Sequence, residues 1–508
     1  MRDLLIVSLV LAGAVLALRR PWIGVMNWTW LSIMNPHRYA WGIAYSAPLA
    51  AIAAASTLVG LVLTKERQSP FQGAPVWWLA ALTMWITLSW QLGIDPAGDY
   101  PMWDRVIKIY LMTFVALALL RTRYDMLAFA WVTIGSLAVL ATKGGLFTVL
   151  KGGNYRVFGP PSSFIADNND FALATVVCIP MIRFLQLQVE HRWLRHGLTV
   201  VMLLSAASAL GSHSRGGLLA LIGMAGVFWL RSQHRIKTGA LIAVAALALL
   251  PFMPEHWWER MHTIRNYQED GSAMGRINAW IVAWHTAQEY FFGGGMSYQH
   301  QFLFDQYGPY ENTVRAAHSI YFQILGNHGF VGLFIYLMMW ISAFRCAGWL
   351  RKHAREAPET KWAADLGSMV QVSLAGFAVG GSFLSLSYFD LPYNLMVLVV
   401  LAKAWVMRRG WETDPQVSFL EYAGIKRPPP RPPGMAAPGA FGTPPLTPQP
   451  ARDHTAAAEP AVRVAATDTQ ARETGGQAAV SRGLRAPRVD QIARARAILR
   501  GKPYKEPG

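Results

Sequence analysis

Residues 106–142 read VIKIYLMTFVALALLRTRYDMLAFAWVTIGSLAVLAT and contain two apolar runs joined by a short basic turn. The runs cover 106–120 and 126–142, and Arg121 and Arg123 lie between them. About 20 apolar residues span a bilayer as a helix, and shorter runs are tolerated inside a bundle. This stretch therefore predicts two membrane helices that turn back on each other.

The same alternation of apolar runs and basic turns continues along most of the chain. It predicts an all-α fold, a polytopic transmembrane helix bundle of twelve or thirteen spans. The count is open because the first two runs are short and form either two spans or one broken span. The predicted runs are 4–18, 22–35, 43–63, 76–93, 106–120, 126–142, 170–187, 197–211, 216–230, 238–253, 319–344, 368–388 and 391–407.

The composition agrees with a membrane protein. Hydrophobic residues make up 53% of the chain and charged residues 15%, whereas soluble domains carry roughly 25% charge. The net charge of +17 does not require a nucleic-acid partner, because membrane proteins collect Lys and Arg in cytoplasmic loops. With only two cysteines, we expect neither a disulfide framework nor a thiolate metal site.

The basic turns also predict the orientation. If the runs alternate across the membrane, every basic cluster falls on one side, which the positive-inside rule makes cytoplasmic. We therefore expect a multi-pass membrane protein with a cytoplasmic C-terminal tail. The clusters lie at 19–20, 65–67, 121–123, 183–195, 231–237, 345–361 and 408–409. The segments left for the outer face are 94–105, 143–169, 212–215, 254–317 and 388–391.

Four regions follow from these patterns. Residues 1–253 and 318–409 form the N-terminal and C-terminal transmembrane helices, and 254–317 forms an outer, periplasmic loop with an amphipathic helix. Residues 410–508 are rich in Pro and Ala and too poor in apolar residues to fold, which predicts a disordered, basic cytoplasmic tail. A basic stretch at 482–500 could contact anionic lipid or a partner, or serve only as a solvated tail.

Two arginines on the predicted outer face are candidates for binding an anion. Arg215 lies in GSHSRGGLLAL, where two glycines permit close backbone approach and a guanidinium could fork onto a phosphate. The alternative is an arginine that extends to the membrane interface. Arg276 opens the amphipathic helix predicted at 276–292, where free backbone N–H groups would also face an anion.

Further polar candidates lie where outer segments meet apolar runs. His318 begins HSIYFQILGNHGFVGLFIYL and could remove a proton from a hydroxyl, although an isolated histidine at a helix mouth is often only structural. We interpret His328, deeper in that run, as structural. Asp390 in SYFDLPYN and Asn169 in ADNNDFAL could support a site, and Asn169 could equally cap a helix.

Several familiar chemistries are missing from the sequence. EHWWERMH is not the HExxH of a zinc protease, and no P-loop, GxSxG or GxGxxG motif occurs. Asp95, Asp99 and Asp104 do not form the DxD arrangement that holds a metal for nucleotide-sugar donors. We therefore expect no metal and no cofactor.

His318 and Ser319, followed after nine residues by Gly329 and then Gly332, resemble the signature of the O-antigen ligase superfamily. Two weaker motifs of that family are similar to segments that precede it in the expected order. They are R-x3-L, at Arg215 with Leu219, and an Arg-containing loop helix, at Arg276 with Trp280.

A narrower resemblance is to the O-glycosylation ligases associated with the exosortase A system. It is carried by RRPWIGVMNWTWLSIMNPHRYAWG at 19–42 and DGSAMGRINAW at 270–280. The resemblance covers roughly residues 1–410 and leaves the tail out.

The resemblance implies a metal-independent, inverting membrane glycosyltransferase. Such enzymes transfer a glycan from an undecaprenyl-diphosphate carrier to a hydroxyl acceptor on a protein, lipid or glycan, at the periplasmic side of the bilayer. By position, His318 would be the catalytic base, and Arg215 and Arg276 would bind the diphosphate. The possible supporting residues are Asp390, Asn169 and Ser319.

Two other functions remain open. A polysaccharide polymerase of the same superfamily would share these residues and differ in its acceptor. A flippase for lipid-linked glycans, or another transporter, belongs to a different class and would place charges near the middle of the membrane. The candidate charges instead gather at the outer rim, which favours chemistry on a lipid headgroup.

Overall fold

The computed structural model describes residues 2–232, 234–262, 271–310, 313–415, 417 and 419–422. Most of the predicted tail, from residue 423 onward, lies outside the described residues, as does its basic stretch at 482–500. Within the described residues the regular structure is helical and contains no β-strand, so the predicted all-α fold is confirmed.

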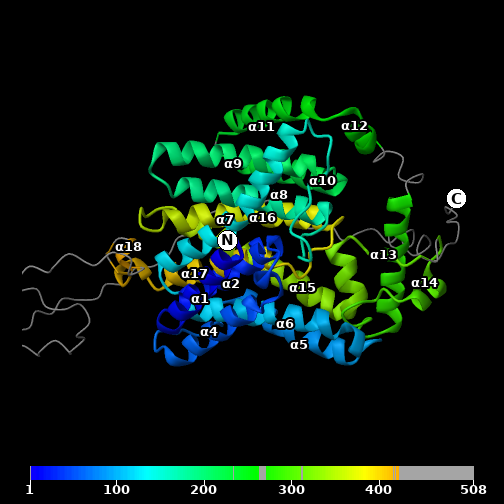
Figure 1. Cartoon of the computed structure of the whole chain (residues 1–508), viewed down its shortest axis with the longest axis horizontal. Helices are drawn as coiled ribbons and strands as arrows, with labels where there is room; N and C mark the ends of the chain where they lie inside the picture. Colours follow the sequence, from blue (N-terminus) through cyan, green and yellow to red (C-terminus); the bar gives the residue numbers. More distant parts are fainter. Residues whose placement is uncertain are drawn as a thin grey trace, which may run out of the picture. The chain divides into compact units, whose positions relative to one another are not determined.

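Many helices follow one another through short turns, and longer irregular segments occur among others at 64–73, 151–167, 290–300 and 382–389 (Figure 1). Their bounds are α1 (Arg2–Arg19), α2 (Pro21–Met34), α3 (Ile43–Ser46), α4 (Leu49–Leu63), α5 (Ala74–Gln91), α6 (Pro96–Leu119), α7 (Arg123–Leu150), α8 (Asn168–Leu187), α9 (Arg192–Gly211), α10 (Arg215–Arg231), α11 (Arg235–Leu249), α12 (Glu255–His262), α13 (Gly271–Glu289), α14 (Gln301–Tyr307), α15 (Ile320–His353), α16 (Lys361–Gly381), α17 (Asp390–Met407) and α18 (Phe419–Tyr422).

Six helices among the described residues are long and apolar enough to cross a membrane: α7, α8, α9, α15, α16 and α17. A polytopic helical membrane protein is therefore confirmed. The first two predicted runs form separate helices, α1 and α2, with a break at Arg20. The prediction of twelve or thirteen spans counted shorter helices as well, and it stays a prediction.

Local sequence signals begin several of these helices. Thr122 and Asp125 form a capping box at the start of α7, in which each side chain accepts a hydrogen bond from the other residue's backbone N–H. Asp95 caps α6 by accepting a hydrogen bond from the N–H of Gly98. A predicted run at 43–63 is interrupted at Pro48, which separates α3 from α4.

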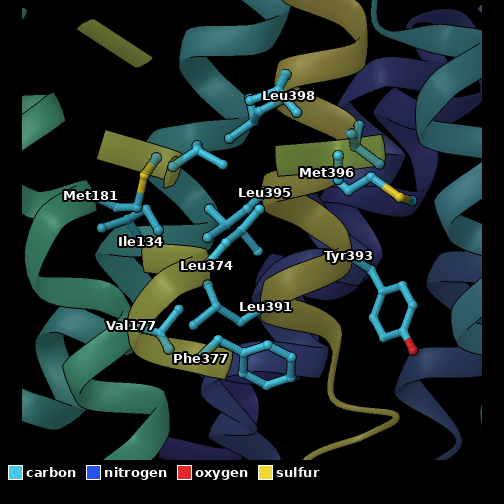
Figure 2. Close-up of a cluster of buried hydrophobic side chains, with 14 of the residues drawn as sticks. Ile134, Val177, Met181, Leu374, Phe377, Leu391, Tyr393, Leu395, Met396 and Leu398 are labelled. Atoms are coloured by element: carbon cyan, nitrogen blue, oxygen red, sulfur yellow. The ribbon is translucent and has the colours of Figure 1, made fainter. Parts of the chain in front are cut away.

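Helix α17 lies at the centre of the main hydrophobic core. Every residue from Asp390 to Ala402 is buried, whereas α11 buries none of its residues. In Figure 2, leucines of α17 face Val177 and Met181 of α8 and Phe377 of α16. Burying apolar side chains stabilises the fold by about 25 cal/mol per Å², so this helix anchors the bundle.

Some predicted boundaries are wrong. Helix α7 continues to Leu150, so the outer segment predicted at 143–169 begins about two helical turns later. Helix α16 ends at Gly381, and the apolar residues that follow it are not helical.

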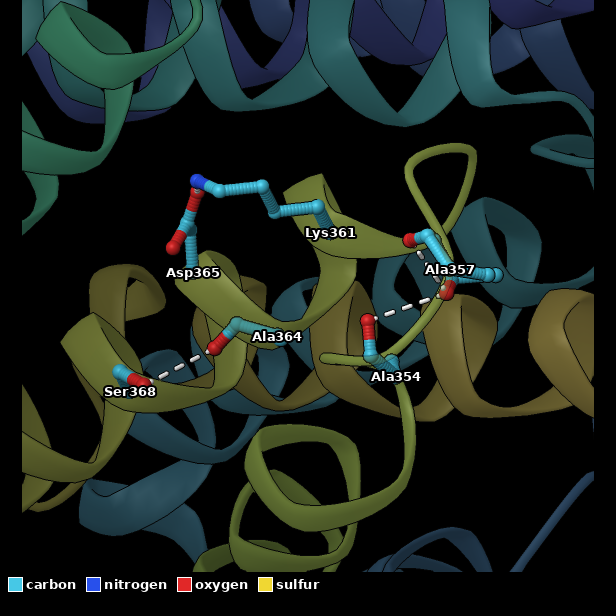
Figure 3. Close-up of polar contacts among 7 residues, drawn as sticks. Ala354, Ala357, Lys361, Ala364, Asp365 and Ser368 are labelled. Atoms are coloured by element: carbon cyan, nitrogen blue, oxygen red, sulfur yellow. Dashed lines mark hydrogen bonds and ion pairs between the residues drawn. The ribbon is translucent and has the colours of Figure 1, made fainter.

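The turn before α16 is closed by hydrogen bonds: the hydroxyl of Thr360 donates to the carbonyl oxygens of Ala354 and Ala357 at 3.0 and 3.2 Å, and Figure 3 shows this turn.

The predicted basic turns meet at one end of the helices. A guanidinium nitrogen of Arg20 donates to the backbone oxygen of Tyr422 at 2.7 Å, and Arg408 donates to the side-chain oxygen of Gln68 at 2.9 Å. Figure 1 shows α18 at this end and α13 and α14 at the other. The turns that alternate in sequence are therefore sorted to two ends, as the charge pattern predicts.

Candidate functional site

At the end opposite the basic turns, three segments far apart in sequence come together. The amide nitrogen of Asn168, at the start of α8, donates to the backbone oxygen of Ser212 before α10 at 2.7 Å. The backbone N–H of Ser385, between α16 and α17, donates to a carboxylate oxygen of Asp170 at 3.2 Å. These two contacts join the start of α8 to the turn before α10 and to the segment between α16 and α17.

His318 is held in an unusual backbone conformation directly before α15. Its φ is +44°, in the left-handed region that side chains other than glycine rarely adopt. The indole N–H of Trp280 on α13 donates to the backbone oxygen of the preceding Ala317 at 2.7 Å. Trp280 also stacks on Phe322 of α15, with ring centroids 5.0 Å apart. Helix α13 thus fixes the segment that carries His318.

The imidazole of His318 is partly buried, and hydrogen bonds within the described residues do not occupy all of its polar atoms. Its Nδ1 atom is buried and has no hydrogen-bond partner among the described residues. Ser319 follows as the residue before α15 and is buried, but its side chain does not cap the helix. A buried imidazole nitrogen without a partner is costly in a resting structure, so it is available for a ligand.

Charged neighbours define the electrostatics of this imidazole. Burial lowers the pKa of His318 from its ordinary value of 6.5, and the positive charge of Arg276 lowers it further. The negative charge of Asp167 opposes both effects and raises the pKa. The net effect is a lowered pKa, so His318 is neutral at pH 7 and can accept a proton.

Arg276 lies near both His318 and the start of α8. Its charge acts on the imidazole of His318 and on the carboxylate of Asp170. The prediction that Arg276 opens its helix is wrong, because α13 already begins at Gly271 within the described residues. Arg276 therefore offers its guanidinium group to the site, without the free N–H groups of a helix start.

Arg215 begins α10 at the same end of the bundle. The hydroxyl of Ser214 caps the helix by accepting a hydrogen bond from the N–H of Gly217 at 3.0 Å. The glycines after Arg215 permit close packing: a Cβ on Gly217 would lie 2.7 Å from the Cβ of Ala172 in α8. A Cβ on Gly216 would lie 3.2 Å from the Cβ of Phe383. Arg215 thus adjoins the turn that contacts Asp170.

Asn169 does not cap α8. The cap is Asp167, whose carboxylate accepts hydrogen bonds from the backbone N–H and the side-chain amide of Asn169 at 2.8 and 2.9 Å. The cap interpretation of Asn169 is therefore wrong by two residues. Asn169 instead holds the carboxylate of Asp167, whose negative charge raises the pKa of His318.

The structure does not bring Asp390 to His318. The hydroxyl of Ser32 donates to a carboxylate oxygen of Asp390 at 2.6 Å, and the nearby positive charge is that of Arg105 on α6. No hydrogen bond joins Asp390 to His318 in the described part of the chain. The residue lies at the predicted end of the bundle, but it supports the packing of α17 against α2.

Gly329, in the second half of the signature that begins at His318, has a structural role. Helix α15 is kinked at Gly329, whose φ is +67°. The N–H groups of Gly294 and Gly295 donate to the carbonyl oxygens of Gly326 and Asn327 at 2.8 and 2.9 Å. The glycine-rich loop after α13 therefore packs into the kink, which needs Gly329 for its positive φ.

His328 beside this kink is fully paired, as the structural interpretation requires. Its ring nitrogens contact the hydroxyls of Ser89 and Tyr388 at 2.8 and 2.7 Å. The Ser89 hydroxyl donates to the carbonyl of Phe292 at 2.7 Å, so the imidazole Nδ1–H donates to Ser89 and Nε2 accepts from Tyr388. One tautomer satisfies the whole network.

Sequence reasoning missed three charged residues at this site. Asp167 and Asp170 flank the polar pair ADNND that drew attention only to Asn169, and their carboxylates face the cationic groups. The side chain of Arg315 packs against α13, because a Cβ on Gly275 would lie 3.3 Å from its Cγ. The signal was present as charges on the predicted outer face, within three residues of the candidates Asn169 and His318.

The arrangement offers cations and a neutral base. In the described residues, no group of three or more His, Cys, Asp or Glu side chains is placed to hold a metal ion. A developing negative charge at this end would therefore meet guanidinium groups, and a hydroxyl would meet the imidazole of His318. Such a set can bind an anionic headgroup and remove a proton next to it.

Comparison with known families assigns two parts of the chain. Residues 1–190 match a family of unknown function (DUF5935), and residues 200–337 match the family described as O-antigen ligase. No curated protein matches the chain. The second match contains Arg215, Arg276 and His318, whereas Asn169 and Asp390 lie outside it.

Proposed function

We propose that the chain is a membrane glycosyltransferase of the ligase or polymerase kind, and the match of residues 200–337 to the O-antigen ligase family supports this. From this premise we propose that the chain transfers a glycan from an undecaprenyl-diphosphate carrier to a hydroxyl acceptor. The reaction proceeds with inversion and without a metal. The narrower resemblance to exosortase-associated O-glycosylation ligases belongs to this proposal.

In the proposed reaction, His318 removes the proton from the acceptor hydroxyl while that oxygen attacks the anomeric carbon of the donor sugar. The new C–O bond forms as the bond between this carbon and the diphosphate oxygen breaks, and the electron pair leaves with the carrier diphosphate. Arg215 and Arg276 bind the diphosphate and neutralise its growing charge. Stabilising a leaving group in this way is worth several kcal/mol.

The observation that carries the proposal is the state of His318. Its Nδ1 is buried without a hydrogen-bond partner among the described residues, and its pKa is lowered by burial and by Arg276. A neutral imidazole beside a guanidinium group suits a base that acts next to an anionic leaving group. A purely structural histidine would be expected to pair both ring nitrogens, as His328 does.

The carboxylates at the start of α8 have a positioning role in this proposal. Asp170 is fixed by the N–H of Ser385 and lies within electrostatic reach of Arg276. Asp167 acts on the imidazole and opposes the lowering of its pKa by Arg276. His318 is therefore neutral at rest, and the negative charge of Asp167 stabilises it when it accepts a proton.

The proposed location is the bacterial inner membrane, with the site at the periplasmic side and the tail in the cytoplasm. Support comes from the sorting of basic turns to the end opposite His318, as the positive-inside rule requires. Polyprenyl-diphosphate glycans present their headgroup at a bilayer surface, which matches a site at one end of the helices. The acceptor is a protein, lipid or glycan hydroxyl.

A polysaccharide polymerase would use the same residues, with a glycan chain as acceptor. The O-antigen ligase domain fits both activities. The two differ in product: a ligase attaches a finished glycan once, whereas a polymerase lengthens it. Chain length of the product, resolved on a gel, separates them.

The experiment is a complementation test in producing cells that lack the chromosomal copy. We compare wild type with His318→Ala and with His353→Ala, an exposed histidine near the far end of α15. We expect His318→Ala to abolish glycan attachment and to accumulate the lipid-linked donor, while His353→Ala restores both. Normal attachment with His318→Ala at equal protein level would contradict the proposal.

A further inference from the structure

A second group of cationic side chains lies outside the candidate site, in the N-terminal part of the chain. His37 and Arg38 belong to a 3₁₀ turn, Pro36–Tyr39, directly after α2. Arg105 lies in α6 and Lys143 in α7. All four are contributed by residues 1–190, the part that matches a family of unknown function.

This cationic group lies at the same end of the bundle as His318. The hydroxyl of Ser32, near the end of α2, donates to Asp390 at the start of α17. Arg105 donates to the backbone oxygen of Ser162 at 2.8 Å, in the segment between α7 and α8. The cations therefore face the predicted outer surface, where the positive-inside rule disfavours them.

Aromatic rings fix three of these cations in place. Each charged group lies over a ring face, an arrangement that orients the side chain without neutralising it. The pairs are Arg38 with Tyr45 at 5.3 Å, Lys143 with Tyr39 at 4.9 Å and Arg105 with Phe164 at 4.5 Å from the ring centroids.

The positive charge of this group is not balanced by salt bridges. Within the described residues, Arg38, Arg105 and Lys143 form no ion pair. Two carboxylates in this part of the chain accept hydrogen bonds from neutral groups: Asp3 from the N–H groups of Gly42 and Ala44, and Asp390 from the hydroxyl of Ser32. Arg105 is exposed to the repulsive charge of Arg38 as well as the attractive charge of Asp390.

A cavity of about 460 Å³ lies beside the 3₁₀ turn, within the range of small-molecule sites of roughly 300–1,000 Å³. His37 and Arg38 form its polar wall, and Tyr45, Pro48 and Leu49 contribute to the opposite wall. His37 Nδ1 and Arg38 Nε are buried and have no hydrogen-bond partner among the described residues. Buried polar atoms without a partner are costly, so these two atoms are available to bind an anion.

The surroundings of the cavity point to a lipid. Trp41 is 95% exposed and Ile43 71% exposed, and both lie between the 3₁₀ turn and the cavity's apolar wall in sequence. Exposed Trp and aliphatic side chains beside basic residues are typical of a membrane–water interface. A ligand entering here from the bilayer would present its phosphate to Arg38 and its glycerol and chains to the apolar wall.

We propose that this cavity binds the headgroup phosphate of an anionic membrane lipid, with Arg38 as the main contact and His37 as a second donor. Lys143 and Arg105 add long-range attraction. The site is separate from the proposed catalytic residues and does not depend on glycan transfer.

The test is lipid binding by the full-length protein in neutral detergent, followed by native mass spectrometry. The probes are phosphatidylglycerol, phosphatidylcholine and inorganic phosphate. The variants are Arg38→Ala, the milder Arg38→Lys, and Arg67→Ala as a matched control that removes one exposed charge in the turn after α4. Melting temperatures verify that each variant is folded.

We expect Arg38→Ala to weaken phosphatidylglycerol binding about tenfold, the loss of one charge-assisted contact. Arg38→Lys retains the positive charge but loses the planar guanidinium group, which can donate two hydrogen bonds to one phosphate, so we expect about threefold weaker binding. Arg67→Ala and binding of phosphatidylcholine should not change. Equal phosphatidylglycerol binding by wild type and both Arg38 variants overturns the proposal. Displacement of the lipid by millimolar inorganic phosphate would also overturn it, because the site would then take a free anion.

Discussion

His318 and His328 are ten residues apart on one segment, yet their surroundings differ in every respect. His328 is enclosed in the kink of α15, and both ring nitrogens are paired with hydroxyl groups. His318 lies before the helix with a positive φ, an unpaired buried Nδ1 among the described residues and charged neighbours. A histidine saturated by hydrogen bonds holds the fold, whereas an unsaturated one next to charges is available for chemistry.

The largest expected difference is in transfer rate. Replacing His318 by Ala removes the proposed base, and general base catalysis typically contributes about 10²–10⁴-fold. We expect a loss of this size in glycan transfer by purified protein in proteoliposomes, with an unchanged melting temperature. His318→Ala with a rate within threefold of wild type would remove the distinction between the two histidines.

The next effect concerns the arginines that accompany His318. Arg215→Lys keeps the charge but loses the planar fork that binds a diphosphate with two hydrogen bonds. We expect transfer to fall about 10- to 100-fold. Arg156→Lys, an exposed arginine between α7 and α8, is the control and should transfer at the wild-type rate. Equal rates for both variants would mean that Arg215 only extends to the interface.

Substitutions around His328 should lower the stability of the fold instead of the transfer rate. Ser89→Ala removes the hydroxyl that contacts His328 and Phe292 and leaves buried groups without partners, at a cost of about 1–3 kcal/mol. We expect a lower melting temperature and an unchanged transfer rate per folded molecule. A large loss of rate at full stability would show that this network takes part in the chemistry.

The smallest effect is expected at Asp390. Its carboxylate accepts the hydroxyl of Ser32, and an amide oxygen can accept the same bond. Asp390→Asn should therefore change transfer by less than about threefold, measured in the same proteoliposomes. A loss near that of His318→Ala would return Asp390 to the catalytic group.

The apolar pattern predicted much of the fold, because each membrane helix must satisfy its own backbone hydrogen bonds. The start of α17 was placed within one residue by the turn at Asp390, and α10 by Ser214 and Arg215. The ends of α7 and α16 were not, since α7 continues beyond its apolar run and α16 stops before the end of its run. The sequence identified Gly329 as part of a motif. The kink of α15 at Gly329 depends on packing of the loop that contains Gly294, and no local sequence pattern predicts that contact.

Arg215 and Arg276 were singled out because they are charges on the predicted outer face. His318 was singled out by its place where an outer segment meets a helix and by the family resemblance. The roles of all three stay predictions. Asp167 and Asp170 were overlooked because acidic residues are ordinary at a helix start. Asp390 was predicted as a possible supporting residue from its position in the last outer turn, whereas in the structure its carboxylate accepts a hydrogen bond from Ser32 of α2.

The central claim is that His318, with a pKa lowered by burial and by Arg276, is the base for transfer. The most direct measurement is the pH dependence of kcat/KM in wild type and in Arg276→Gln. Because the pKa is lowered, activity should persist as pH falls through 6.5 and decline only at more acidic pH. Removing the charge of Arg276 raises this pKa, so the acidic decline should shift to higher pH. A wild-type decline centred at or above 6.5, or a decline that Arg276→Gln leaves in place, would contradict the account.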